Sequence, residues 1–275
     1  MIISATMTPV PSCFGPILFT GSISESLTHI SEIGYHGVEL HISTPHHLDI
    51  EEFFYLLSKH GLTLTSIGTG LSYADEGLSF GSDDKIIRDK AVQRIKDIID
   101  LFAASKPVII IGTMKGKLSA AKNKEIAKSR IREALHECAV YADRSGMIIA
   151  LEAINRYEQD YLNTLAESAE LIDSIGASNI KVHADIFHMN IEEMSISGAI
   201  YAFKDYLGHL HFADNNRLSP GQGGIDFKDI LLALKNIGYE GSIGIECMPK
   251  PDGKSAAIRG YRYLSTVAEQ IDISL

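Results

Sequence analysis

The sequence predicts a (β/α)8 barrel, the TIM barrel architecture, formed as a single domain by residues 1–275. Three observations predict it. Short apolar runs alternate with amphipathic helical segments along the chain, which is typical of parallel strands joined by right-handed helical crossovers. The length is close to the roughly 250 residues that this barrel needs. Several apolar runs also end in a charged residue, and barrels of this type carry their active sites at those strand ends.

Eight short runs rich in β-branched and other apolar residues are the predicted strands. They cover residues 2–7, 37–41, 62–68, 108–111, 147–151, 180–184, 207–210 and 242–245. Eight strands favour closure into a barrel over the alternative, an open doubly wound sheet. The open sheet predicts a Gly-rich phosphate loop after the first strand. Residues 9–15 do not supply the GxGxxG pattern of such a loop.

The predicted helices lie between these strands. They cover residues 22–33, 49–60, 83–105, 120–145, 164–175, 198–204, 226–237 and 255–271, with a polar helix or turn at 191–195 and a longer loop at 69–82. Asp49 is a candidate cap for the second helix, and Gly61 is typical of a helix end. The third helix has an apolar face at helical spacing, formed by Ile87, Ala91, Ile95, Ile98 and Phe102.

The composition restricts the classes of function. Hydrophobic residues make up 45% of the chain, enough for a large core, and the formal net charge of −10 argues against binding of nucleic acid through its phosphates. Cys13, Cys138 and Cys247 form no CxxC motif, which fits a reducing compartment. We recognise no signal peptide and no apolar run of membrane-spanning length, so we expect a soluble, cytoplasmic protein without a membrane partner.

Four residues at predicted strand ends carry the strongest chemical signal: Glu152, Asp185, His211 and Glu246. Any one of them could be a helix cap or an ion-pair partner, but their common placement on four consecutive strands favours a divalent-metal site. Carboxylates with a single imidazole suit Mn²⁺, Mg²⁺ or Co²⁺ better than a thiolate-type zinc site does. Glu152 and Glu246 stand at the two ends of this arc, so we expect one carboxylate on each face of a bound substrate.

Three motifs surround these residues: ExxNRYE from Glu152, DxFHMNIEE from Asp185 and HxxDxNRxxPGxG from His211. In these stretches the chain resembles the ketose 3-epimerases, the group of D-tagatose and D-psicose 3-epimerases within the xylose isomerase-like superfamily of sugar isomerases and epimerases. The resemblance covers residues 152–246, and the second motif is quite specific. In the first half of the chain, the strand–helix rhythm and residues 34–40 are similar to the superfamily.

The resemblance implies a divalent ion, commonly Mn²⁺, held by all four strand-end residues. It implies that Glu152 and Glu246 also act as acid and base. It implies that His188 and Arg217 bind the oxygens at the C1–C3 end of a sugar, with Glu158 close to that end. By the same resemblance, we expect a homodimer or homotetramer.

The chemistry of a ketose agrees with these implied roles. The proton on C3 is α to the C2 carbonyl, and a metal ion on O2 and O3 would stabilise the enediolate that forms when this proton leaves. Inversion requires removal of a proton from one face and delivery to the other, which two carboxylates can perform. Arg217 and His188 could donate hydrogen bonds to the developing oxyanion. The leading hypothesis is therefore a metal-dependent sugar epimerase acting at C3 of a ketose.

Some features depart from the family pattern and leave the C4–C6 end of the sugar open. Residues 8–15 do not match the aromatic loop associated with free-sugar epimerases, and the chain has no tryptophan. Residues 224–226 replace a Gly-His pair that is common in the superfamily. Lys115 and Lys117, which follow the fourth strand, could meet a phosphate or carboxylate of a charged sugar.

Other residues keep a plain alternative. Glu39 and His41 end the second strand at the same mouth of the barrel, without an assigned role. Glu158 could simply pair with Arg156. Cys247 has no evident partner base, so we interpret it as a packed thiol rather than a nucleophile.

The same scaffold could support other reactions. One is an aldose–ketose isomerase of the hydroxypyruvate isomerase type, and another is a decarboxylase or dehydratase of a keto-sugar acid. Hydrogen exchange at C1, or release of CO₂ or water, would separate these from a 3-epimerase. An endonuclease IV type of DNA-repair enzyme needs more histidine ligands and a basic surface, which the acidic composition disfavours. A non-catalytic sugar-binding protein would result if the site does not load a metal.

Overall fold

The structure is a computed structural model that describes residues 1–11 and 15–275. Its centre is a parallel barrel of β1 (Ile2–Thr8), β3 (Gly37–His41), β4 (Thr63–Gly68), β5 (Val108–Ile111), β6 (Ile149–Glu152), β7 (Ile180–Asp185), β8 (Leu207–Phe212) and β9 (Ser242–Ile245). Each of these strands pairs with the next, and β1 also pairs with β9, which closes the ring. The predicted TIM barrel is therefore confirmed.

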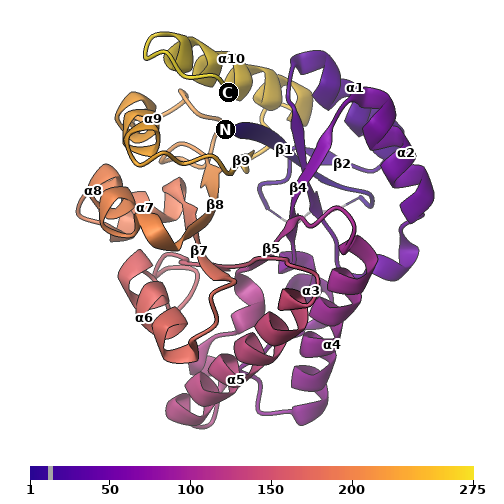
Figure 1. Ribbon diagram of the computed structural model, residues 1–275, viewed down its shortest axis with the longest axis vertical. Coiled ribbons are helices and arrows are strands. Elements are labelled where there is room, and N and C mark those ends of the chain that lie inside the picture. Colours follow the sequence, from indigo (N-terminus) through magenta and orange to yellow (C-terminus); the bar gives the residue numbers. More distant parts are fainter. Residues whose placement is uncertain (12–14) are drawn as a thin grey trace.

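Helices surround the strands (Figure 1). They are α1 (Ile23–Ile33), α2 (Ile50–His60), α4 (Lys85–Phe102), α5 (Lys124–Asp143), α6 (Leu165–Ile175), α8 (Ile196–Ala202), α9 (Phe227–Asn236) and α10 (Gly253–Glu269). Their ends follow the sequence signals. The side chain of Asp49 caps α2, and Gly61 ends it with a φ of 66°. The apolar face predicted for α4 is buried except at Ile87, which is half-buried.

Two predictions on the helices after β4 and β5 are wrong in part. The loop predicted at 69–82 contains a helix, α3 (Gly70–Glu76). The long helix predicted from residue 120 begins at Lys124, after a 3₁₀ turn at Leu118–Ala120. The physical reason for the later start is Asn123, whose side chain accepts hydrogen bonds from the backbone N–H groups of Glu125 and Ile126 and so begins the helix there.

A third correction bears directly on the site. The helix or turn predicted at 191–195 is instead α7 (Ile186–Glu192), which begins immediately after β7. Asp185 makes this possible because its Oδ1 accepts a hydrogen bond from the N–H of Phe187 at 2.8 Å and so caps the helix. The short strand β2 (Phe19–Thr20), which extends the sheet beside β1, was not predicted.

Two of the cysteines lie in the interior of the protein. Cys138 and Cys247 are buried free thiols, and burial raises the pKa of Cys247 to about 12, as suits a packed thiol. Cys13 and part of the unmatched 8–15 segment lie outside the described residues. Within the described ranges, none of the helices is both long and apolar enough to cross a membrane.

Candidate metal and sugar site

The four residues predicted to bind a metal lie together at the C-terminal end of the barrel, and all are buried. Glu152 and Asp185 are the last residues of β6 and β7, His211 is next to last in β8, and Glu246 follows β9 directly. One ligand atom from each of Glu152, Asp185 and His211 lies within 4.8 Å of the other two. Oε2 of Glu246 lies 3.2 Å from Nδ1 of His211. The four side chains therefore lie close together, as their placement at neighbouring strand ends predicts.

Arg217 places a positive charge among these carboxylates. Its guanidinium contacts Oδ2 of Asp185 at 2.6 Å and also contacts the carboxylate of Glu246. It lies over the ring of Phe187, with 4.6 Å between the guanidinium carbon and the ring centre. Arg217 therefore holds two of the predicted metal ligands together through charge.

Asp214, in the third motif, shapes the loop that carries Arg217. Its buried carboxylate accepts hydrogen bonds from the backbone N–H groups of Gly221 and Ile225, at 3.0 and 3.1 Å. A Cβ atom at Gly223 would lie 2.3 Å from Oδ1 of Asp214, so this position requires glycine. The aspartate and this glycine of the motif therefore fold the loop rather than contact a substrate.

His188, on α7, faces the predicted ligands. Its Nε2 lies 3.6 Å from Oε1 of Glu152 and 3.7 Å from Oδ2 of Asp185. The amide Nδ2 of Asn155 donates a hydrogen bond to Nδ1 of His188 at 2.7 Å, so the neutral ring carries its proton on Nε2. The same Nδ2 donates to Oε1 of Glu158 at 2.9 Å. Asn155, for which no role was predicted from the sequence, therefore orients two residues of the predicted sugar site.

Glu158 is half-exposed and lines the same cavity as His188. The alternative pairing of Glu158 with Arg156 is wrong, because Arg156 forms its ion pair with Glu192, at 2.6 Å between Nη2 and Oε2. The acidic group of Glu158 therefore remains at the cavity.

The cavity opens at the C-terminal end of the barrel, and its charged lining consists of residues that the sequence predicts as functional. They are Glu152, Glu158, His188, His211, Arg217 and Glu246, with His41 beside them. Much of the remaining lining is small, and includes Gly68, Thr69, Gly70, Gly112 and Thr113. Among the lining residues that the structure describes, Arg217 is the one lysine or arginine.

The two lysines after β5 do not form the predicted anion site. Lys115 is fully buried, and its Nζ donates to the backbone carbonyls of Glu152 at 2.9 Å and Gly112 at 3.4 Å. Lys117 is exposed and lines a separate surface hollow, which Tyr73 also lines. The prediction that both lysines could meet a charged group of the substrate is wrong, because Lys115 is committed to the chain itself.

Glu39 is the main feature that the sequence left unassigned. Its carboxylate, fully buried in β3, lies 2.7 Å from Nε2 of His41, 2.8 Å from Nε2 of His209 and 2.7 Å from Nε2 of His211. The hydroxyl of Ser66 donates to Oε2 of Glu39 at 2.6 Å. A charged residue thus sits directly under the predicted metal ligands. The only sequence signal for it is its position two residues before His41, on the same side of the same strand.

The electrostatics of the two predicted acid–base residues differ. Burial and the negative charges of Glu246 and Asp185 raise the pKa of Glu152 to about 8. Burial also favours the neutral form of Glu246, but the positive charges of His211 and Arg217 outweigh it and lower the pKa of Glu246 to about 2. In the metal-free site at neutral pH, Glu152 therefore favours its protonated form and Glu246 its ionised form.

These residues fit a divalent cation. Burial lowers the pKa of His211, yet the carboxylates of Glu39 and Glu246 hold it well above its ordinary value. Because Nε2 of His211 donates to Glu39, the additional proton sits on Nδ1, on the side of the predicted ligands. Nδ1 makes no hydrogen bond to any residue in the described part of the chain. In the metal-free site, protons on His211 and Glu152 thus offset part of the negative charge of the carboxylates. A bound cation would displace these protons and offset that charge itself.

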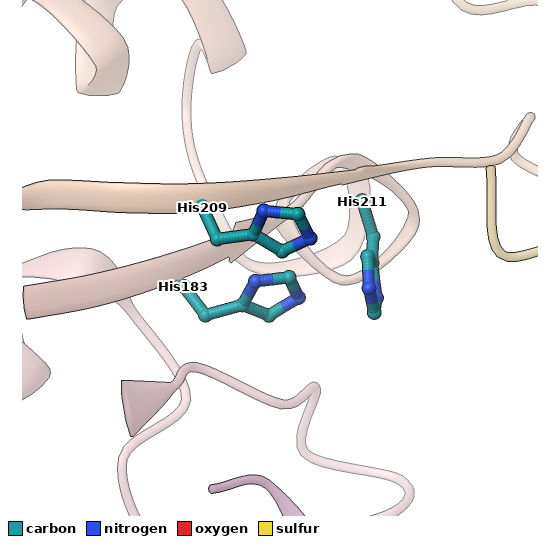
Figure 2. A group of neighbouring side chains, drawn as sticks. All are labelled: His183, His209 and His211. Atoms are coloured by element: carbon teal, nitrogen blue, oxygen red, sulfur yellow. The ribbon is translucent and has the colours of Figure 1, made fainter. Parts of the chain in front are cut away.

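Three imidazoles form a second group beneath this site: His183, His209 and His211 (Figure 2). The rings of His183 and His209 stack with 5.2 Å between their centres, and His211 meets His183 edge-on at 4.1 Å. The two ring nitrogens of His183 have no hydrogen-bond partner among the residues described. His183 and His209 were not predicted as site residues, although both lie two residues before a predicted ligand.

Comparison with known proteins agrees with this geometry. A family model described as xylose isomerase-like TIM barrel matches residues 27–266. The D-psicose 3-epimerase of Ruminiclostridium cellulolyticum is 34% identical over 249 residues, which cover 88% of this chain and 84% of that protein. The 3-dehydro-D-guloside 4-epimerase of Escherichia coli is 26% identical, over 88% of this chain and 93% of that protein.

Among solved structures, D-psicose 3-epimerase from Clostridium cellulolyticum H10, crystallised with D-tagatose, has a TM-score of 0.82 and 25% identity over 97% of this chain and 99% of that chain. The likeness thus extends well beyond the three motifs. The predicted class of enzyme, a carbohydrate epimerase, is confirmed by these relatives. The chain belongs to the xylose isomerase-like TIM barrel family, and its resemblance to the ketose 3-epimerases within that family is confirmed.

Proposed function

We propose that this protein is a metal-dependent epimerase that inverts C3 of an uncharged ketohexose or ketopentose. The observation that carries the proposal is the presence of Glu152 and Glu246 in one buried cavity, with Asp185 and His211 on the two strands between theirs. All four would hold the ion, for which Mn²⁺ is the first choice and Mg²⁺ or Co²⁺ the alternatives. When bound, the ion would act as a Lewis acid toward the sugar oxygens.

Two glutamates that flank a bound sugar can move a proton across a carbon atom. One would remove the proton from C3 on one face, while the other, once it carries a proton, would deliver that proton to the other face. In the reverse reaction the two exchange roles. His188 and Arg217 would donate hydrogen bonds to the oxygens on which negative charge develops. Glu158 would accept a hydrogen bond from a sugar hydroxyl.

The cavity favours a sugar without a charged group. Arg217 already contacts two carboxylates, and Lys115 points its ammonium at backbone carbonyls. A phosphate would therefore meet Glu158 and the other carboxylates without a free cation among the described lining residues. The names of several relatives support the same substrate class, since they are epimerases of D-psicose and L-ribulose.

The test is incubation with Mn²⁺ in D₂O and a panel of fructose, tagatose, ribulose and xylulose. The metal is removed by chelation before the proton NMR spectrum is recorded. We expect deuterium at C3 together with growth of the C3 epimer. Deuterium at C1 with formation of an aldose would instead establish an aldose–ketose isomerase. A protein that binds Mn²⁺ but exchanges no hydrogen in any of these sugars would refute the proposed substrate class.

We also propose that the chain forms a homodimer or homotetramer, by its likeness to the ketose 3-epimerases. Sedimentation equilibrium of the purified protein tests this, and a monomer at micromolar concentration would contradict it.

A further inference from the structure

The carboxylate of Glu39 accepts four hydrogen bonds inside the barrel. Oε1 accepts from Nε2 of His41 and from Nε2 of His211, both at 2.7 Å. Oε2 accepts from Oγ of Ser66 at 2.6 Å and from Nε2 of His209 at 2.8 Å. An ionised carboxylate offers about four lone-pair sites, so Glu39 is fully occupied by these donors.

This arrangement fixes which nitrogen of each ring carries the proton. Glu39 can only accept, so His41, His209 and His211 must each present an N–H at Nε2. The second nitrogen of His209 agrees with this assignment, because its Nδ1 lies 2.9 Å from the hydroxyl of Ser242, which can donate to it. A metal ligand whose other nitrogen is held by a carboxylate is a recurring arrangement in metal sites, since it orients the ring and raises its basicity.

For His211 this assignment determines which ring nitrogen can bind a metal ion. With Nε2 bound to Glu39, only Nδ1 remains, and it faces the other predicted ligands. It lies 3.2 Å from Oε2 of Glu246 and 3.9 Å from Oδ2 of Asp185. Gly244 leaves room for this pair, because a Cβ atom at this position would lie 2.9 Å from both the carboxylate of Glu39 and the ring of His211.

We propose that Glu39 is the positioning residue of the metal site. Its carboxylate holds His211 with Nε2–H directed into the barrel, so that Nδ1 is the atom that binds the ion. The inference rests on the metal dependence of the proposed function, and it adds a residue and a ligating atom to that site.

The alternative is a second ion bound by the three imidazoles of Figure 2. One observation favours the role of Glu39 instead. The Nε2 atoms of His209 and His211 are already bonded to Glu39, which occupies the direction that a second ion would need.

The first experiment needs no variant of Glu39. The ring nitrogens of the histidines are observed by ¹⁵N NMR in the folded wild-type protein, with and without Mg²⁺, and His211 is assigned from the His211→Gln spectrum. We expect Nε2 of His211 to stay protonated and Nδ1 to shift when Mg²⁺ binds. A metal-induced shift of Nε2, with the proton on Nδ1, would overturn the proposal.

The second experiment measures Mn²⁺ affinity by titration calorimetry. Substitutions next to a metal ligand cost about 10–100-fold in affinity, and we expect a loss of this size for Glu39→Gln. The matched control is Ser66→Ala, which removes a hydrogen bond from the other oxygen of Glu39 and should stay within about twofold of the wild type. Circular dichroism confirms that both variants are folded.

The possible results are distinct. A folded Glu39→Gln protein with wild-type affinity would overturn the positioning role while leaving the epimerase proposal intact. A wild-type protein that binds no Mn²⁺ would refute the metal dependence of the proposed function itself. Two ions per chain, one of which disappears in His183→Phe, would contradict the single-ion assignment.

Discussion

The guanidinium of Arg217 lies 2.6 Å from Oδ2 of Asp185 and at the same time contacts Glu246. The three side chains are largely buried, so water cannot solvate the two carboxylates well. The positive charge of Arg217 compensates their negative charges instead. Removal of one partner of a buried ion pair costs about 3–5 kcal/mol, because it leaves a charge without compensation. We expect Arg217→Met to lower the Tm of the metal-free protein, and Mn²⁺ to restore much of the loss by supplying the missing charge.

The measurement is differential scanning fluorimetry of metal-free and Mn²⁺-loaded protein. The control is Lys85→Met, since Lys85 forms an ion pair with Asp89 at the surface, and this variant should leave both Tm values nearly unchanged. An Arg217→Met protein with the Tm of the wild type in the absence of metal would show that the contact has no role in stability.

The raised pKa of Glu152 predicts how metal binding depends on pH. Its pKa of about 8 means that the metal-free protein carries a proton on Glu152 at neutral pH, and a cation must displace this proton to bind there. The affinity for Mn²⁺ should therefore rise with pH up to about 8, by up to about tenfold per pH unit for each proton displaced. The raised pKa of His211 adds a second displaced proton.

Titration calorimetry in buffers of different ionisation enthalpy counts the protons released. We expect release at about pH 7 in the wild type, and one proton fewer in Glu152→Gln, where the group that loses it is absent. Affinity that does not change between about pH 6 and 8 would contradict the electrostatics described for this site.

Gly112 gives Glu152 the space that it needs. An ideal Cβ atom at position 112 would lie 2.1 Å from Oε2 of Glu152. The carboxylate is the mobile end of a flexible side chain, so Gly112→Ala should fold normally but displace the carboxylate from the site. Misplacement of a catalytic group by about 1 Å can cost about 100-fold in rate, and we expect a loss of kcat of that order.

Gly224→Ala is the matched control for this substitution, because a Cβ atom at position 224 meets nothing within 4 Å. Its kcat and Mn²⁺ affinity should equal those of the wild type. Equal activity of Gly112→Ala and Gly224→Ala would mean that the position of the Glu152 carboxylate does not govern the reaction.

Lys115 should matter for stability rather than for the charge of the substrate. Lys115→Met keeps the volume of the side chain but leaves the carbonyls of Glu152 and Gly112 without their donor. A buried acceptor without a partner costs about 1–3 kcal/mol, so we expect a loss of that size in the free energy of unfolding measured with urea. Lys117→Met, at an exposed position, should change it by less than about 0.5 kcal/mol. A larger loss of stability for Lys117→Met than for Lys115→Met would contradict the structural role of Lys115.

The sequence predicts the barrel and the convergence of the strand-end residues because both depend on local order along the chain. Glu152, Asp185, His211 and Glu246 come together once neighbouring strands pair in parallel, and no further information is needed. The start of α7 is less accessible, since it depends on whether the side chain of Asp185 caps a helix or points elsewhere. Asp185 could cap a helix or bind a metal ion, and the order of residues along the chain does not tell which of these roles it takes.

Contacts between distant strands are harder to predict still. Glu39 and His211 are 172 positions apart, and only closure of the barrel places the carboxylate on the imidazole. The role of Lys115 is wrongly predicted from the sequence for a similar reason. Lysines are usually exposed, and the burial of Lys115 against the carbonyl of Glu152 follows from how β5 and β6 lie side by side.

The most direct measurement of the central claim compares Glu152→Gln and Glu246→Gln in D₂O with both C3 epimers of one ketose. Each variant should retain bound Mn²⁺, which elemental analysis checks, because glutamine still offers a carbonyl oxygen. With one base removed, each variant should at most exchange the C3 hydrogen of a single epimer, a different epimer for each variant, and neither should invert C3 at a measurable rate. Inversion at the wild-type rate by either metal-loaded variant would contradict the two-carboxylate mechanism.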